Sequence, residues 1–473
     1  MPDVRRSVLL TALALACLAV AASAQTVTIE YLTGVMATDL SADGSVIVGN
    51  RQNTYEPFRW TEETGVQLLG RCSYEVLGVG AGGPKVSADG TRLSATIPGA
   101  DSTYATQGVW TLGEGWIETM PPAPADGGMM DLAYGSAWGL SGDGQTLVGL
   151  YWRPGQPGGL AHASAWTADG GLVDLGSGGG NSRANAASYD GSVIVGWDED
   201  PGFGTWWPTV WRDGVRTVLA QPDAFCLANS VTDDGSIIGG VTYEESQRSR
   251  VGALWHWNGS SYDVQILGVL EGSTPGDYAQ AIVNGITPDG SMCVGYNQYS
   301  FNPGDASGFI WTPEGGMVAV GDYLAGHGIT VPADLLLTTI AGVSDDGSVM
   351  VGIGQYYTPP FDNVTFIIRA TDLTDVPDAA AGLAVGAAYP NPFNPRTSIP
   401  VTLDRAAAVS VEIFDLAGRR VRTLHRGHLA AGDHVFAWHG VDDHGSAVPS
   451  GVYLARAGDG HGRTVARRLT LAK

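Results

Sequence analysis

A short phrase of the form Ser-x-Asp-Gly followed by an apolar run occurs seven times along this chain. The copies are SADGSVIVG, SADGTRLSA, SGDGQTLVG, SYDGSVIVG, TDDGSIIGG, TPDGSMCVG and SDDGSVMVG, which begin at Ser41, Ser87, Ser141, Ser188, Thr232, Thr287 and Ser344. Successive copies lie 46, 54, 47, 44, 55 and 57 residues apart, the length of one four-stranded propeller blade. The repeat therefore predicts an all-β chain with a seven-bladed β-propeller over residues 25–370.

Each repeat contains the pieces of one blade. The Asp-Gly pair between apolar runs predicts a tight hairpin, and small residues before it suit an innermost strand, where the sheets converge. A tryptophan recurs in the third piece of six copies, where we expect it to pack between neighbouring sheets. These residues are Trp60, Trp110, Trp166, Trp211, Trp255 and Trp311, with Ile367 or a neighbour in their place in the last copy.

The last repeat ends at TFIIRA and lacks a fourth strand, whereas an orphan strand-like piece, residues 25–32, precedes the first repeat. We therefore predict that this N-terminal strand pairs with the seventh blade near residues 362–370. Such pairing closes the ring and removes the open sheet edges that promote aggregation.

Residues 1–24 read as a cleaved export signal. Two arginines precede the apolar run from Val8 to Ala22, and Ala22-Ser23-Ala24 forms a small-x-small cleavage site. A lipoprotein alternative would use Cys17. No later run is long and apolar enough to span a membrane, so we expect a mature chain without a transmembrane segment.

The charge is unevenly distributed. Residues 25–379 hold 12 Lys+Arg against 40 Asp+Glu, a balance of −28, and residues 380–473 hold 11 against 7, a balance of +4. Because residues 25–379 are so acidic, they repel nucleic acid and anionic lipid, and we expect neither as a partner.

A linker rich in Ala and Gly, residues 371–388, separates the propeller from a tail at 389–473. Alternating patterns in the tail predict six or seven short strands of a small β-sandwich. The predicted strands are Thr397–Leu403, Ala408–Asp415, Arg420–Leu424, Asp433–His439, Gly451–Ala457 and Thr464–Leu471.

Two family resemblances follow from these motifs. SADGSVIVG with PFRWT resembles the HAF-type extracellular repeat, and the blades are similar to the SPDG-type blades of periplasmic propellers. In the tail, YPNPFNP, VEIFDLAGRRVRTL, AGDHVFAWHGVDDHG, VPSGVYLARA and RRLTLAK resemble a type IX secretion C-terminal sorting domain, with His439 where that family usually has Asp. The same pattern is similar to the Ig-like domain of flagellar hook-capping proteins. The sorting-domain resemblance implies export through an outer membrane, often with later removal of the domain.

Several residues could bind a metal ion or form a disulfide, and each also has a purely structural interpretation. The turn aspartates Asp43, Asp89, Asp143, Asp190, Asp234, Asp289 and Asp346 suggest calcium, but they lie on seven blades, so we interpret them as hairpin formers. His434, His439 and His444 are spaced by five, which suits no shared metal. Cys72, Cys226 and Cys293 are expected to be buried, although one disulfide between two of them is compatible with export.

Aromatic residues in longer loops offer a glycan- or peptide-binding face, with packing inside hairpins as the alternative. They are Trp152, Trp197, Trp206, Trp207, Tyr356 and Tyr357. Loop lengths vary most in blades two, five and six, where we expect any binding surface.

No phosphate loop, HExxH, GxSxG or CxxC motif occurs, and the blades lack the sialidase Asp-box pattern. The sequence therefore predicts no catalytic, cofactor-binding or metal site, and a secreted or surface-displayed binding protein of a Gram-negative-type bacterium. An exported propeller enzyme acting on polysaccharide, a lyase or hydrolase with paired carboxylates at one channel mouth, is the alternative. A structural envelope or matrix component is the third reading.

Overall fold

The computed structural model describes residues 25–71, 82–99, 105–119, 135–152, 160–200, 202, 204–220, 224–273, 279–299, 305–372, 384–385, 388–403, 407–415, 419–430, 432–458 and 464–472. Two compact units account for the described residues, one ending at residue 371 and the other beginning at residue 372. The predicted export signal and Cys72 lie outside the described residues.

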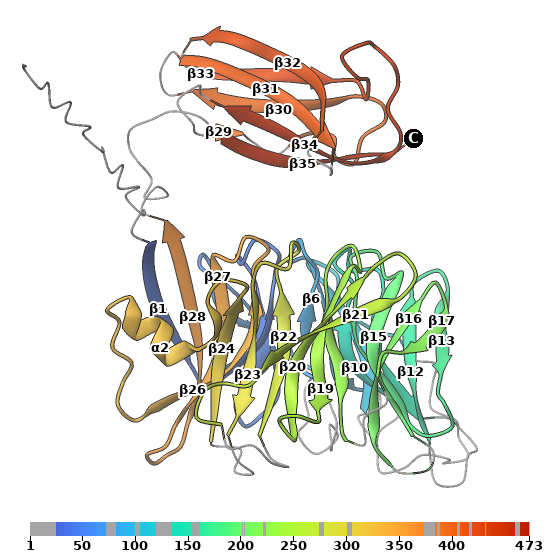
Figure 1. Cartoon of the computed structure of the whole chain (residues 1–473), viewed down its shortest axis with the longest axis vertical. Helices are drawn as coiled ribbons and strands as arrows, with labels where there is room; N and C mark the ends of the chain where they lie inside the picture. Colours follow the sequence, from blue (N-terminus) through green and yellow to red (C-terminus); the bar gives the residue numbers. More distant parts are fainter. Residues whose placement is uncertain are drawn as a thin grey trace, which may run out of the picture. The chain divides into compact units, whose positions relative to one another are not determined.

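The first unit is a β-propeller whose described strands form seven blades, numbered in chain order (Figure 1). Blade 1 comprises β2 (Val35–Leu40), β3 (Ile47–Arg51), β4 (Pro57–Thr61) and β5 (Gly65–Leu68). Blade 2 comprises β6 (Lys85–Val86), β7 (Arg92–Pro98), β8 (Ala105–Thr111) and β9 (Gly115–Glu118). Blade 3 comprises β10 (Gly135–Leu140), β11 (Leu147–Trp152), β12 (Ala161–Thr167) and β13 (Gly171–Gly176).

The next three blades repeat this order. Blade 4 comprises β14 (Ser182–Ala187), β15 (Val193–Glu199), β16 (Trp206–Arg212) and β17 (Val215–Val218). Blade 5 comprises β18 (Leu227–Val231), β19 (Ile237–Glu244), β20 (Ser249–Trp257) and β21 (Tyr262–Gly268). Blade 6 comprises β22 (Gln280–Ile286), β23 (Cys293–Gln298), β24 (Ala306–Thr312) and β25 (Gly316–Ala319), and one parallel bridge, Arg250 with Gln280, links it to blade 5.

The seventh blade is built from both ends of the unit, which confirms the predicted closure. Its sheet order is β1 (Gln25–Thr33), β28 (Asn363–Asp372), β27 (Val349–Tyr356) and β26 (Leu335–Val343). Val27, Ile29 and Tyr31 of β1 pack against the blade's buried core. The N-terminal strand is therefore the outermost strand of the last blade, and it leaves β28 no free edge.

One helix, α2 (Val320–Gly326), occurs in the described residues, between blades 6 and 7, and the sequence interpretation did not foresee it. Its N-cap residue, Ala319, makes no side-chain cap bond, and the segment holds two glycines, so it carries few helix-start signals. Val320 and Leu324 are buried in the core of blade 7, so tertiary packing holds the helix. None of the described helices has the length and apolar character needed to cross a membrane.

The recurring tryptophans lie between blades, as predicted. Trp60 packs against Val349 and Val351 of blade 7, and Trp255 packs against Val193 of blade 4. In each copy the tryptophan pairs with the residue six positions after the start of the phrase, for example Ile47 with Trp60. In the last blade that residue, Met350, pairs with Ile368, so the neighbour of Ile367 takes the tryptophan position.

Most copies of the phrase end in glycine because a side chain at this position would collide with the inner strand. A Cβ at Gly49 would collide with the Met36 carbonyl oxygen of the inner strand, and Gly196 meets the Arg183 carbonyl in the same way. The inner strand carries a bulge beside this position, which brings its backbone close to the second strand. In blade 2 the inner strand is only two residues long, and Ala95 occupies the equivalent place.

The second unit is a two-sheet β-sandwich, in agreement with the Ig-like prediction. One sheet has the order β29 (Ala384–Val385), β30 (Thr397–Leu403), β33 (Gly432–Trp438), and the other β32 (Arg420–Leu429), β31 (Ala407–Asp415), β34 (Gly451–Gly458), β35 (Thr464–Leu471). The short β29 falls inside the segment expected to be only linker. Phe393 of YPNPFNP is buried against Trp438, which anchors the motif in the core.

Candidate ligand-binding surface

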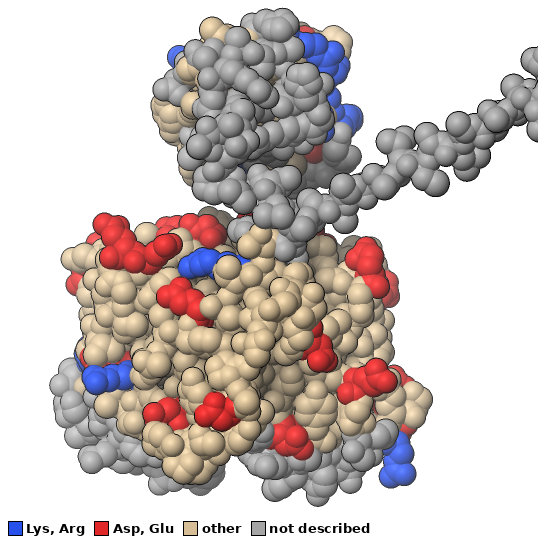
Figure 2. Space-filling model, turned by 90° about the vertical axis from the view of Figure 1, so that its left-hand side faces the viewer, with Lys and Arg blue, Asp and Glu red and all other residues tan. Residues whose placement is uncertain are grey.

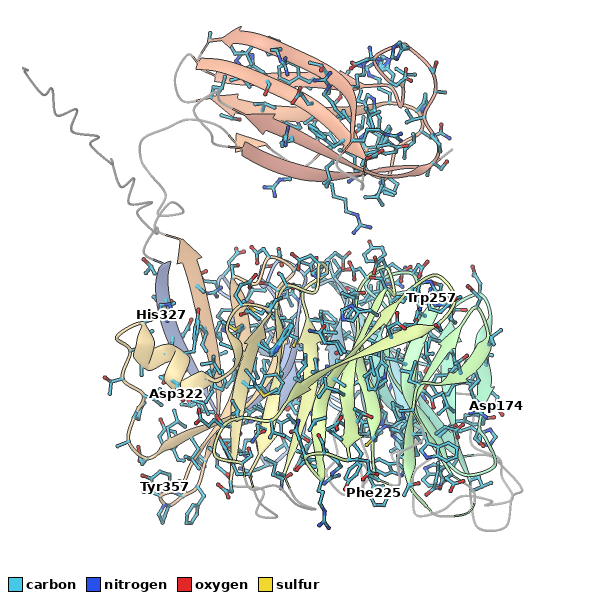
Figure 3. The ribbon with its side chains drawn as sticks, viewed as in Figure 1. Asp174, Phe225, Trp257, Asp322, His327 and Tyr357 are labelled. Carbon is cyan, nitrogen blue, oxygen red and sulfur yellow. The ribbon has the colours of Figure 1, made fainter. Side chains whose placement is uncertain are left out.

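The propeller has two chemically different faces. The Ser-x-Asp-Gly turns form the upper face in Figure 1, and the loops between second and third strands, with the connections between blades, form the lower face. Tyr357 and Phe225 lie at that lower edge (Figure 3).

On the upper face, the turn aspartates are fully used inside their own turns. Asp43 Oδ1 accepts hydrogen bonds from the Ser41 hydroxyl at 2.7 Å, the Ser45 backbone N–H at 2.9 Å and the Ser45 hydroxyl at 2.8 Å. Ser41 Oγ in turn accepts from the Val46 N–H, and Gly44 supplies the positive φ of the turn. In every other copy too, the hydroxyl of the first residue of the phrase donates to the turn aspartate.

This bonding perturbs the carboxyl groups. Partial burial raises the pKa of these aspartates, but the hydroxyl and backbone donors outweigh it and leave the pKa below its ordinary value. The lowered pKa applies to Asp43, Asp89, Asp190, Asp234, Asp289 and Asp346. The structure thus gives these residues the hairpin-forming role that the sequence interpretation preferred to calcium binding.

Successive turns are also joined through their backbones. The Ala42 N–H donates to the Ala88 carbonyl, and the Ala88 N–H donates to the Gly142 carbonyl. The Asp345 N–H donates back to Ala42, which links the last blade to the first. The upper face is therefore a bonded rim of turns.

The axial channel holds a cavity of about 150 Å³ at the inner strands. Bulged residues of these strands point toward it, because a bulge re-aims one side chain. Asn185 Nδ2 donates to the Ala228 carbonyl of the next blade, and Asn284 Nδ2 donates to the Ile340 carbonyl. These asparagines tie adjacent blades together around the axis.

Asp39 is the single carboxylate among the described residues that line this cavity. Burial raises its pKa, against the opposing effects of Lys85, whose Nζ lies 3.9 Å away, and of the Val86 N–H. The paired carboxylates expected of a polysaccharide-cleaving enzyme at the channel are not found among the described lining residues.

A larger groove of about 490 Å³ opens on the lower face at the seam where blade 7 meets blade 1. The loop after β3 and the loop after β27 form its walls, and residues more than 300 positions apart meet there. Gln52 Nε2 donates to Asp362 at 3.3 Å, and the Asn363 N–H donates to Gln52 Oε1 at 3.2 Å. The lining comprises Thr33, Gly34, Arg51, Gln52, Asn53, Asp334, Tyr356, Thr358, Pro359, Pro360, Asp362 and Asn363.

The two groove loops present exposed rings on strained backbone. Tyr55, Tyr357 and Phe361 are 39%, 52% and 55% exposed. Asn53, Tyr55 and Phe361 have φ of 70°, 56° and 63°, a left-handed conformation that non-glycine residues rarely adopt. Strain of this kind collects at binding and active sites, and exposed rings supply flat contact surfaces.

The aromatic residues singled out from the sequence divide between separate blades. Tyr356 and Tyr357 belong to the groove loop of blade 7. Trp197 and Trp206 stack at 4.4 Å in blade 4, where Trp206 also meets the ring of Phe225 edge-on at 5.2 Å. Trp152 and Trp207 are half-buried at strand ends. The groove lies at blades 7 and 1 rather than in blades two, five and six, whose loops 100–104, 274–278 and 300–304 lie outside the described residues.

A Ser–His–Asp hydrogen-bond chain in blade 3 escaped the sequence interpretation. Asp174 Oδ1 lies 2.9 Å from His162 Nδ1, and His162 Nε2 lies 3.4 Å from Ser177 Oγ. Its connectivity is that of a hydrolytic triad. However, the Gly178 N–H donates to Asp198 and the Gly179 N–H to Ser177 itself, so the two backbone donors that follow the serine are occupied. We assign the chain to packing between blades 3 and 4.

The remaining candidate residues are two cysteines of the propeller and three histidines of the tail. Cys226 and Cys293 are free thiols, fully buried, and burial raises the pKa of each to about 12. His439 and His444 are exposed, and His434 contacts the Ala430 carbonyl. Across the described residues, no group of three or more His, Cys, Asp or Glu side chains is arranged to hold a metal ion.

Solved structures similar to this chain are distant. TolB from Acinetobacter baumannii is 13% identical and matches over 62% of each chain with a TM-score of 0.38. The β-propeller domain of the Trilobed protease from Pyrococcus furiosus is 14% identical, matches 73% of this chain and 98% of its own length, and gives a TM-score of 0.43. At this level they carry no argument about function.

The tail has a more specific match. The FlgD Ig-like domain family matches residues 394–459. Basal-body rod modification protein FlgD from Salmonella typhimurium and its counterpart from Salmonella typhi are each 42% identical over 69 residues, which is 14% of this chain. The matched segment spans only 30% of the length of these curated relatives. The tail therefore carries an Ig-like domain of the FlgD type.

Proposed function

We propose that this protein is a secreted or cell-surface binding protein without a catalytic centre, and that its ligand is a glycan or a peptide. The groove at the blade 7–blade 1 seam supports this proposal best, because polar side chains line it and the exposed rings of Tyr55, Tyr357 and Phe361 lie on the loops that form its walls. Rings stack on sugar or peptide surfaces while Gln52, Asn53 and Thr358 offer hydrogen bonds.

The negative charge on the propeller surface limits the charge of the ligands that the groove can bind. Asp and Glu side chains are scattered over the propeller face drawn in Figure 2, with few Lys or Arg among them. A groove in such a body favours neutral or mildly charged ligands over polyanions.

A bulky substitution that fills the groove tests this proposal. Thr358→Trp places a bulky ring among the lining residues, and Thr64→Trp is the matched control on an exposed upper-face loop. A glycan and peptide array followed by calorimetry should find a ligand whose affinity falls at least tenfold in the Thr358 variant and is unchanged in the control. Equal binding by both variants would refute the groove, and a fully negative array would favour a structural envelope component.

An enzyme acting on polysaccharide is the second candidate, because two carboxylates, Asp334 and Asp362, line the same groove. Thr358 Oγ1 donates to Asp334 at 3.0 Å, and Gln52 holds Asp362. Release of reducing ends from a glycan, abolished by Asp334→Asn or Asp362→Asn, would establish it over the binding protein.

We further propose that the C-terminal domain addresses the protein for type IX export. The resemblance of the tail motifs to type IX sorting domains, and of the repeat to HAF-type extracellular repeats, supports this role. Cell fractionation should find the protein at the surface or in the medium, and a chain lacking residues 389–473 should stay in the periplasm. Unchanged surface delivery of the truncated chain would contradict the sorting role.

A further inference from the structure

Arg183 lies in an unusual environment for a charged residue. It stands on β14, the inner strand of blade 4, and its guanidinium carbon lies 3.5 Å from the ring centroid of Trp138 in blade 3. The centroid of the Trp197 ring lies 5.4 Å from the same guanidinium carbon. Two indoles from neighbouring blades therefore fix the guanidinium plane by cation–π contact.

This guanidinium has no carboxylate partner among the described residues. Its one hydrogen bond runs from Nε to Asn185 Oδ1 at 2.7 Å, which leaves the four N–H groups of the two terminal nitrogens without a protein acceptor. Two other arginines of the propeller do have a carboxylate partner: Arg71 pairs with Glu118, and Arg216 pairs with Asp198.

The burial of Arg183 makes its lack of a negatively charged partner unfavourable. Burial lowers the pKa of Arg183 to about 9, and no negative group opposes that effect. A partly desolvated cation without a counter-charge is unfavourable, so an anion supplied from outside would be stabilised there. Arg183 keeps part of its surface exposed, which leaves it accessible to such a group.

A second unsatisfied donor lies beside it. Trp197 is 6% exposed, and its buried Nε1–H has no acceptor in the described structure. Trp197 stacks on Trp206, and Trp206 contacts Phe225, which is 49% exposed at the lower edge of the propeller (Figure 3). Trp197, Trp206 and Phe225 thus form a row of contacting rings, a ring ladder, from the Arg183 guanidinium to the surface.

We propose that Arg183 and this ladder form a receptor for one carboxylate group on a ligand that also has an aromatic or sugar ring. The guanidinium fork matches the two oxygens of a carboxylate, and the aromatic side chains stack on the apolar face of the ligand's ring. One carboxylate is favoured over a polyanion, because the body as a whole repels dense negative charge. Blade 4 lies across the ring from the blade 7–blade 1 seam, so this site is separate from the groove.

A terminal uronic acid and the C-terminal carboxylate of an aromatic peptide share this chemistry. Calorimetry and tryptophan fluorescence on the full chain should compare glucuronic acid with glucose, and N-acetylphenylalanine with its amide. We expect one acid to bind at least tenfold more tightly than its neutral partner, and the tighter acid identifies the source. Equal affinity of both acids and their neutral partners, or no binding at all, overturns the receptor.

Variants locate the site. Arg183→Met should abolish the preference for the acid, whereas Arg248→Met, which removes an exposed charge on blade 5, should leave it intact. Trp206→Ala should weaken ring-bearing acids but not acetate. Retained acid preference in Arg183→Met refutes the assignment. The acid–neutral comparison uses the unchanged chain, so the test holds even if a variant fails to fold, and Thr358→Trp should have no effect on it.

Discussion

The carboxylates of the turns show how much one residue type contributes when it is repeated. Each aspartate receives hydroxyl and backbone donors from its own hairpin, as Asp43 does from Ser41 and Ser45. Charged acceptors make hydrogen bonds about twice as strong as neutral ones, so these are among the stronger local bonds of the blade.

Asp43→Ala should lower the free energy of unfolding by about 1–3 kcal/mol, because three donors lose their acceptor at once. Asp43→Asn keeps one acceptor oxygen and should cost less. Urea unfolding of the three chains measures the order wild type, Asn, Ala. An alanine variant as stable as wild type would contradict the role given to the turn.

The lowered pKa of six turn carboxyls sets the direction of acid sensitivity. Since their folded pKa lies below the unfolded value of about 3.9, their contribution is complete above that pH and is lost as pH falls through the folded pKa. The raised pKa of buried Asp39 acts in the opposite sense.

We therefore expect the urea midpoint to be flat from pH 7 to 5 and to fall below about pH 4. The fall should be shallower in a chain with several turn aspartates changed to asparagine. A midpoint that rises on acidification would show that buried carboxyls such as Asp39 dominate instead.

At the scale of elements, the decisive feature is β1. It lies on the outside of blade 7, where Val27, Ile29 and Tyr31 cover the blade's core. Without it, β28 would present an unpaired edge, a template for aggregation.

Deleting residues 25–33 should lower the free energy of unfolding by about 3 kcal/mol or more, through lost apolar burial, and should produce oligomers in size-exclusion chromatography. A synthetic peptide of residues 25–33 added in trans should restore the monomer, whereas a scrambled peptide should not. A stable monomeric truncation would mean that ring closure depends on the blade interfaces alone.

Elements with a repeated pattern were predictable from the sequence, and those formed by distant contacts were not. The Ser-x-Asp-Gly phrase is local, so turns, blade number and closing strand followed from it. Helix α2 has no capping residue and is held by tertiary packing, which a single sequence does not display. Arg183 and Trp138 are 45 positions apart and meet because a bulge turns Trp138 inward, so no local pattern announced their contact.

The whole molecule consists of two units with separate cores. Phe393, Ile399 and Trp438 belong to the core of the C-terminal unit, while other clusters serve the propeller. A calorimetric scan should therefore resolve two unfolding transitions, and a chain ending at residue 372 should keep the propeller transition within a few degrees. A single cooperative transition, lost on truncation, would show that the two units stabilise one another.

The seventh blade also constrains the order of events during synthesis. Its outer strand is made first and its other three strands last, about 310 residues later. A nascent chain with six finished blades still exposes the unpaired strand β1 and the apolar faces of blades 1 and 6 that blade 7 will cover. We expect ring completion to be the slowest folding step, because contacts between segments so distant in sequence form slowly.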